Sequence, residues 1–174
     1  MNRMHLLMVA LLVGDLCACA PAFNWREFVA EGSGVVATFP CRPDRHARLV
    51  ALAQAKVRME MVVCAAGGST FALAFLDVAD PARVMATLDD LQAAALANVQ
   101  GDRPQRAPAQ VRGMTANSRA VRLSAQGRLP GGDAVQVHAA FFAKGLRVYQ
   151  ATVMGVAPAP QVVEIFLGGL KFPA

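Results

Sequence analysis

Cysteine and histidine are the residue types in this chain that could do chemistry most readily, and the chain has 4 and 3 of them. Downstream of the N-terminal segment they are Cys41, Cys64, His46 and His138. Their spacing fits neither a C-x-x-C redox motif nor an H-x-x-x-H metal motif. A lone histidine on a strand, such as His138 on the same face as Gln136, is more often a hydrogen-bonded residue than a catalyst. A thiol- or histidine-dependent enzyme therefore stays only as an alternative.

Other common catalytic signatures fail as well. Ser33 and Ser69 lie in glycine-rich turns that lack the G-x-S-x-G arrangement. Gly131-Gly132 is not followed by the Lys-Ser/Thr pair of a phosphate-binding loop. Asp89 and Asp90 are adjacent on a predicted helix, so their carboxylates point about 100° apart. We expect a protein that is not an enzyme and that has no catalytic set, metal site or cofactor.

The first residues of the chain are typical of an export signal. A short basic segment precedes an apolar run over residues 6–14, which is too short for the ~20 residues of a membrane-spanning helix. The following Leu16-Cys17-Ala18-Cys19 resembles the lipobox of bacterial lipoproteins. The resemblance implies a signal peptide over residues 1–18 and a fatty-acylated, palmitate-bearing Cys19. Ala20 is not the aspartate that retains lipoproteins at the inner membrane, so we expect outer-membrane anchorage facing the periplasm.

Ordinary signal-peptidase cleavage is the competing interpretation, because Ala18-Cys19-Ala20 also fits an A-x-A site. That cut would place Pro21 directly after the scissile bond, where its fixed φ suits an extended protease substrate poorly. Acylation of Cys17 is unattractive because the bulky Leu16 precedes it. Asp15, a charge close to the cleavage region, is the feature that argues against lipoprotein processing. We expect a lipid anchor rather than simple secretion.

Cys41 and Cys64 are the thiols that remain after such processing, in a compartment that oxidises them. Strand-like runs over residues 35–40 and 57–63 come directly before them. If these strands are neighbours, a bridge closes a loop of about 22 residues and contributes roughly 3 kcal/mol in the chain-entropy model. We predict a structural disulfide, and a reactive or metal-binding thiol pair is the alternative.

Arginine dominates the formal charge of +5, since only Lys56, Lys144 and Lys171 among the 17 basic residues are lysines. The densest basic patch is a candidate surface for an anionic envelope component or an envelope protein, although such patches are commonly solvated loops. It consists of Arg42, Arg45, His46 and Arg48, with Arg26 before it. One tryptophan and one tyrosine leave little for base stacking, so we expect no nucleic-acid partner.

One domain is predicted over residues 34–174, after an anchor and tether over residues 19–33, because the chain contains no linker or internal repeat. Alternation of apolar residues and the turn signals between them predict its strands. These cover residues 35–39, 48–53, 56–64, 70–78, 110–114, 118–129, 134–143 and 146–154. Residues 101–108 are predicted to be a polar connector.

Two helices complete the prediction. Asp80-Pro81 opens the first as N-cap and first-turn proline, and Gly101 ends it. Its apolar stripe consists of Val84, Leu88, Leu91, Ala95 and Val99. The second covers residues 161–170 and presents Val162, Ile165, Phe166 and Leu170 to the core. The order of elements predicts an α+β fold, with an antiparallel sheet of about seven strands packed by two main helices.

This order, together with Gly34-Val35-Val36-Ala37-Thr38-Phe39-Pro40 as a first strand ending in Phe-Pro, resembles the PsbP-like fold. That fold is shared by the photosystem extrinsic subunit and bacterial DcrB-type lipoproteins. The resemblance implies a sandwich that acts as a binding or assembly module, with no catalytic motif to transfer. We therefore expect a non-catalytic envelope lipoprotein whose domain binds an envelope partner.

Two alternatives stay open. A small hydrophobic ligand carried between the sheet and a helix would need a cavity. Trp25, close behind the expected anchor with Phe23 and Phe28, belongs either at the membrane interface or docked on the domain.

Overall fold

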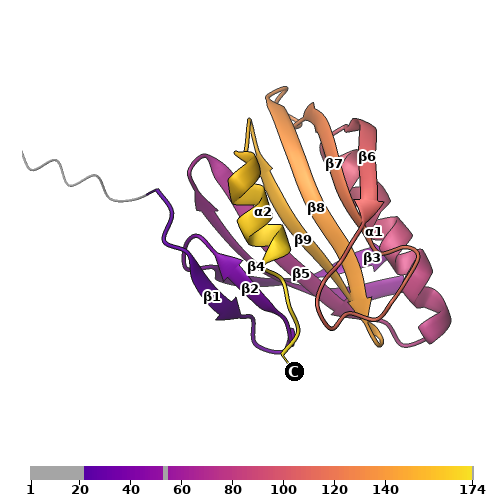
Figure 1. Cartoon of the computed structure of the whole chain (residues 1–174). Coiled ribbons are helices and arrows are strands. Elements are labelled where there is room, and N and C mark those ends of the chain that lie inside the picture. Colours follow the sequence, from indigo (N-terminus) through magenta and orange to yellow (C-terminus); the bar gives the residue numbers. More distant parts are fainter. Residues whose placement is uncertain (1–21, 53–54, 174) are drawn as a thin grey trace, which may run out of the picture.

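Strands are the main secondary structure of residues 22–52 and 55–173, which the computed structural model describes (Figure 1). The strands are β1 (Arg26–Val29), β2 (Val36–Phe39), β3 (Asp44–Leu52), β4 (Ala55–Ala66), β5 (Ser69–Asp77), β6 (Asp102–Pro108), β7 (Val121–Arg128), β8 (Ala134–Lys144) and β9 (Arg147–Gly155). The helical elements are the 3-10 turn η1 (Pro81–Arg83), α1 (Val84–Asn98) and α2 (Pro160–Gly168).

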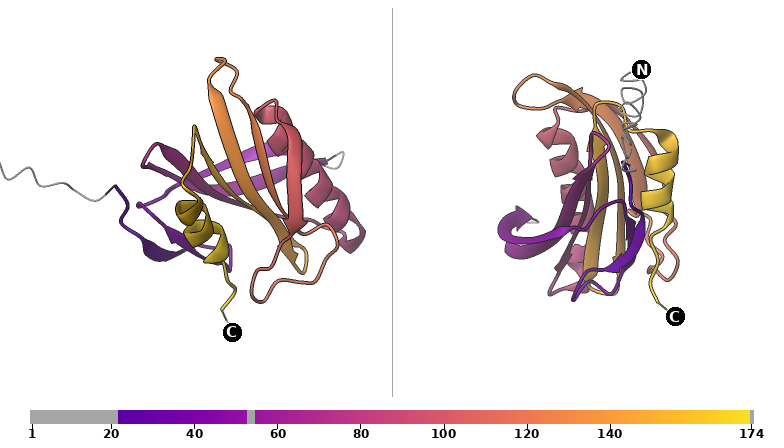
Figure 2. Two further views of the ribbon diagram at one scale, coloured as in Figure 1. Left: turned by 45° about the horizontal axis from the view of Figure 1, so that its top comes forward. Right: turned by 90° about the vertical axis from the view of Figure 1, so that its left-hand side faces the viewer.

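Seven strands form one antiparallel sheet in the order β3-β4-β5-β9-β8-β7-β6, and β1 pairs with β2 in a small second sheet. The large sheet is open, with β3 and β6 at its two edges. Helix α1 lies against one face of this sheet, while α2 and the β1–β2 hairpin cover the other (Figure 2). The fold is therefore a single α+β domain, and the predicted fold class is confirmed.

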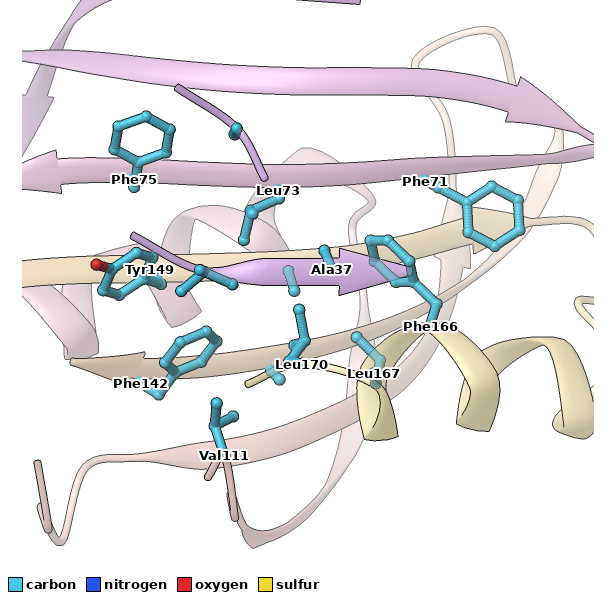
Figure 3. Packing of buried hydrophobic residues seen from close by; sticks show 14 of the residues in the cluster. Ala37, Phe71, Leu73, Phe75, Val111, Phe142, Tyr149, Phe166, Leu167 and Leu170 are labelled. Carbon is cyan, nitrogen blue, oxygen red and sulfur yellow. The ribbon is translucent and has the colours of Figure 1, made fainter. Parts of the chain in front are cut away.

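The face under α2 carries a core rich in phenylalanine (Figure 3). Phe166 of α2 meets Phe39 of β2 at 5.0 Å and Phe71 of β5 at 5.4 Å between ring centroids. Phe142 and Tyr149 stack at 5.0 Å on the neighbouring strands β8 and β9. Edge-to-face and offset ring pairs of this kind add to the stabilisation from apolar burial. Helix, hairpin and sheet are thus held together by one aromatic cluster.

The predicted helix start at Asp80-Pro81 is the start of the 3-10 turn η1, and α1 continues from it at Val84. The side chain of Asp80 accepts a hydrogen bond from the Ala82 amide at 2.9 Å, and Pro81 occupies the first turn. All members of the predicted stripe are buried: Val84, Leu88, Leu91, Ala95 and Val99. They pack on the opposite face of the sheet, against residues such as Phe141. Because both faces of the sheet are covered, Phe141 and Phe142 point in opposite directions and are both fully buried.

Two segment predictions are wrong. Residues 102–108, expected to be a connector, form β6, which pairs with β7. Pro104 and Pro108 concealed this strand, yet proline is compatible with the edge of a sheet, where its missing N–H is not needed. Residues 110–114, expected to be a strand, contain an isolated bridge between Arg112 and Lys171.

Helix α2 is rotated relative to the predicted face. Phe166 and Leu170 are buried as expected, whereas Ile165 is 43% exposed and Val163 and Leu167 are buried. The rotation follows from the packing of α2, which lies on the sheet and beside the hairpin. Its buried face is the one that brings Phe166 between two other rings.

Candidate functional site

Cys41 and Cys64 form a disulfide, with their Cα atoms 6.1 Å apart. The predicted bridge is confirmed, but it does not join neighbouring strands. Cys41 follows β2 in the small sheet, and Cys64 lies in β4 of the large sheet. The bond therefore ties the hairpin to the main sheet. It also uses both interior thiols, so neither is available as a nucleophile or metal ligand while the bond is intact.

The N-terminal segment packs on the domain from its first described residues. The rings of Phe23 and Trp25 stack at 5.6 Å, and Trp25 meets Phe71 edge-on at 5.9 Å. A Cβ atom at Gly67 would lie 2.3 Å from the Phe23 ring, which shows how closely this ring covers the β4–β5 turn. Of the two expectations for Trp25, the structure shows docking on the domain. Strand β1 follows at once, within the range expected to be a tether. The predicted lipidation site, Cys19, lies outside the described residues.

The predicted basic patch is divided by the pairing of β3 with β4. Arg45 is opposite Val62, whose side chain belongs to the core under α2, whereas Arg48 is opposite Met59 of the core under α1. Successive residues of a strand point to opposite faces, so Arg45 lies on one face and His46 and Arg48 lie on the other. Arg42 precedes the strand, beside Cys41. The four residues therefore do not form one surface.

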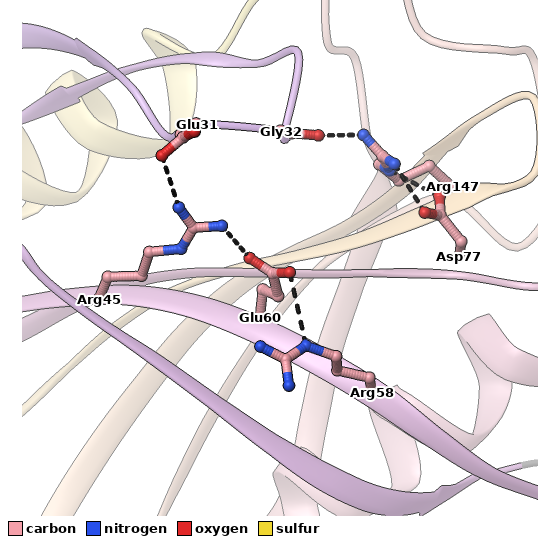
Figure 4. A network of polar contacts seen from close by, with 7 residues as sticks. All are labelled: Glu31, Gly32, Arg45, Arg58, Glu60, Asp77 and Arg147. Atoms are coloured by element: carbon pink, nitrogen blue, oxygen red, sulfur yellow. Dashed lines mark hydrogen bonds and ion pairs between the residues drawn. The ribbon is translucent and has the colours of Figure 1, made fainter.

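Arg45 is occupied by acidic partners (Figure 4). Its guanidinium contacts Glu31 at 2.9 Å and also pairs with Glu60. The hydrogen bond from Arg45 holds the pKa of Glu60 below its usual value. Glu31 lies in the turn after β1, so Arg45 fastens that turn to the sheet. Its role in the structure is to hold the hairpin rather than to present a free positive charge.

A second set of contacts holds the same turn. Arg147 pairs with Asp77 through two hydrogen bonds of 2.6 Å and also donates to the carbonyl of Gly32 (Figure 4). The hydrogen bonds from Arg147 hold the pKa of Asp77 below its usual value. The Tyr149 hydroxyl donates to the Ser33 carbonyl at 2.6 Å. Burial raises the pKa of Tyr149 to about 12.

A polar cleft lies on the α2 side of the large sheet, beyond the aromatic core, and is the best candidate for a functional site. Strand pairing places its floor in two rows across β6, β7 and β8. One row is Gln105, Ser124 and His138, and the other is Asp102, Gln126 and Gln136. These side chains line a cleft of about 540 Å³. A second cleft of about 320 Å³ shares Gln105, Ser124 and His138 with it and extends to α2.

His138 is the unusual member of this floor. Its Nε2 atom is buried and has no hydrogen-bond partner within the part of the chain that the structure describes. Burial lowers the pKa of His138, Arg122 lowers it further, and Glu164 opposes them. The imidazole is therefore neutral at neutral pH. A buried nitrogen without a partner costs about 1–3 kcal/mol.

The wall and rim of the cleft have their own features. Arg122 forms a double hydrogen bond with Glu164 of α2, at 2.7 and 3.0 Å. At the start of β6 the pairing with β7 shifts between Asp102 and Gln105, and Arg103 has a φ of 45°. A non-glycine residue in this conformation costs of order 1–3 kcal/mol, and such bulges are frequent beside binding sites. The cleft is thus bordered by a paired charge and a strained edge.

Part of this site is predictable from the sequence. Gln136 and His138 share a face by alternation, and the pairing of β8 confirms this prediction. Gln105 was not predicted, because residues 101–108 were expected to be a connector. Ser124 and Gln126 were not predicted either, although their spacing of two residues on a strand is a signal for a shared face.

Across residues 22–52 and 55–173, no group of three or more His, Cys, Asp or Glu side chains could hold a metal ion. No helix among these residues is long and apolar enough to cross a bilayer. Comparison with protein-family models finds no match for the chain, and a search of curated proteins finds no significant match.

Proposed function

We propose that this chain is a non-catalytic lipoprotein of the bacterial cell envelope, anchored through Cys19, whose domain binds a partner at the polar cleft. The observation that carries the binding role is the contrast between two parts of one sheet face. Beside the hairpin, this face is closed by aromatic packing. Beside β6, it is open and lined with groups that form hydrogen bonds. A concavity into which several polar side chains converge is a candidate binding site.

The disulfide supports the envelope part of the proposal. Such bonds persist in the periplasm and on cell surfaces and are rare in the cytosol. The docked N-terminal segment supports a short connection, because Phe23 is fixed on the domain four positions after Cys19. At ~3.5 Å per residue, the chain between them spans at most about 14 Å. A lipid on Cys19 would therefore hold the domain close to the membrane surface.

Acylation of Cys19 is tested by expressing the chain in a Gram-negative host, fractionating the cells and measuring the mass of the N-terminal peptide. We expect a diacyl- or triacyl-Cys19 peptide in the outer-membrane fraction. Cys19→Ala should abolish acylation, while the matched control Cys17→Ala should keep it. An unmodified N-terminus in the medium, or a cytosolic chain with residues 1–18 still attached, would refute the anchor.

The packing of the aromatic cluster bears on the alternative in which the domain carries a small hydrophobic ligand. The space between α2 and the aromatic part of the sheet is filled by Phe39, Phe71 and Phe166, each at most 1% exposed. The cleft that borders α2 is lined by both polar and apolar side chains, whereas the larger cleft beside β6 is lined mainly by polar ones. The filled aromatic core and the larger cleft together favour a polar ligand over a small hydrophobic one.

A further inference from the structure

The lining of the polar cleft has no net charge, because its one carboxylate, Asp102, is offset by Arg103, and this restricts what the cleft can hold. Gln126, Gln136 and Ser124 are uncharged, and His138 is neutral because it is buried. Arg122 is already paired with Glu164 at 2.7 Å. At the rim, Arg103 lies 3.9 Å from the carboxylate of Asp102. A phosphate or carboxylate ligand would meet no net positive charge in this lining, so the cleft favours a ligand without charge.

The hydrogen-bonding groups of the floor are arranged for a ligand with many hydroxyls. A glutamine amide offers donors and an acceptor side by side, and a neutral imidazole offers one of each. Neighbouring hydroxyls of a sugar ring also donate and accept, so they match such groups pairwise. Strand spacing of about 4.8 Å across the sheet, and about 7 Å between residues i and i+2, spreads these groups over a surface the size of a few sugar rings. The cleft volume, about 540 Å³, lies within the usual range for ligand sites.

Two other ligand classes fit less well. The residues that line the cleft include no Phe, Tyr or Trp ring on which a nucleobase could stack. A peptide could add to the edge of the sheet at β6, but Pro104 and Pro108 remove two N–H donors there. The side chains of the floor, rather than the backbone of the edge, are therefore the groups that meet a ligand.

We propose that this cleft binds a neutral saccharide through the side chains of Gln126, Gln136 and His138. The inference rests on the proposed function insofar as that function assigns binding to this face. It adds the ligand class and the residues that contact it. His138 joins the two glutamines in the lining of the cleft, and it is the residue that reports on binding there.

The test is a titration of the protein with saccharides, in which NMR monitors the histidine ring protons. The full chain, as isolated, is kept in a polyoxyethylene detergent, which contains no sugar that could compete. The probes are maltotriose and triacetylchitotriose, added to millimolar concentrations. At least one of them is expected to shift the His138 resonance in a saturable manner. His46, on the opposite face of the sheet, is the internal control and should not shift.

Variants make the test specific. Gln126→Ala and Gln136→Ala should each weaken saccharide binding about fivefold, the equivalent of one hydrogen bond of about 1 kcal/mol. The matched control Gln161→Ala, on the exposed side of α2, should bind as the unmodified chain does. Circular dichroism of each variant shows that it is folded.

Several results would overturn the inference. It fails if neither saccharide moves the His138 resonance, if both histidines move alike, or if the glutamine variants bind unchanged. It also fails if inorganic phosphate or an uncharged tripeptide amide moves His138 while the saccharides do not. Acylation is read from the mass of the same sample. Saccharide binding by a chain without acyl groups would refute the anchor alone, and an acylated chain that binds no saccharide would refute this inference alone.

Discussion

Replacing both Cys41 and Cys64 by alanine is expected to lower the free energy of unfolding by about 3 kcal/mol. The bond closes a segment with a sequence separation of 23, and the chain-entropy relation for a loop of that length gives this value at 25 °C. Alanine is preferable to serine because Cys64 is only 8% exposed, and a hydroxyl there would be buried. With a urea dependence of about 2 kcal/mol per molar, the midpoint should fall by about 1.5 M.

Urea titration followed by circular dichroism measures this change. The unmodified chain in excess reductant is the control and should unfold at the same midpoint as the double variant, because both lack the constraint. Thiol alkylation without reductant should label neither cysteine. If the oxidised and reduced chains unfold at the same urea concentration, or if both cysteines are labelled, then the bridge does not restrain the hairpin and the reasoning from loop entropy is wrong.

Three further outcomes are expected. Gly127→Ala should destabilise the domain by about 1–3 kcal/mol in thermal unfolding, because the added Cβ atom would lie 2.0 Å from the backbone oxygen of Val99. The control Gly131→Ala should melt as the unmodified chain does, because the nearest atom to its added Cβ is 3.9 Å away. Tyr149 is the single tyrosine, and ultraviolet titration should show a pKa of about 12. Because an unfolded tyrosine has a pKa of about 10, the unfolded state loses its proton first, so stability should fall as the pH rises above 10 towards 12; a midpoint near 10 would contradict the buried environment. The single tryptophan, Trp25, should show blue-shifted fluorescence that moves to the red in Phe23→Ala, and an unchanged spectrum would argue against docking of this segment.

Local patterns predicted much of the architecture. The cap at Asp80 and the stripe from Val84 to Val99 predicted α1, because capping and a period of 3.6 residues are properties of the segment itself. The hairpin from β8 to β9 was predicted for a similar reason, from a turn at Lys144-Gly145 between alternating strands, and the structure places the turn one residue later, at Gly145-Leu146. Strand β6 was missed because its prolines and charges are typical of an edge strand. Whether a segment lies at the edge depends on the other strands of the sheet and cannot be seen in the segment itself.

The candidate site was predicted less completely. His138 and Gln136 share a face by simple alternation, so a prediction from β8 alone could find them. Gln105 and Ser124 join them through the register of three strands, and register depends on contacts between segments far apart in the chain. In the basic patch, by contrast, residues that are close in the chain are separated by the structure. Arg45 and His46 are adjacent in the chain, yet they lie on opposite faces of one strand.

The sequence by itself determined the two helices, most of the strands, the α+β class and the pairing of two cysteines, because capping, periodicity and the small number of thiols are local or compositional facts. Tertiary structure alone decided that the disulfide joins two sheets, that Arg45 fastens a turn, and that a neutral polar cleft opens beside β6. The physical reason is that side-chain surroundings depend on which strands pair, and that choice is made by burial over the whole domain.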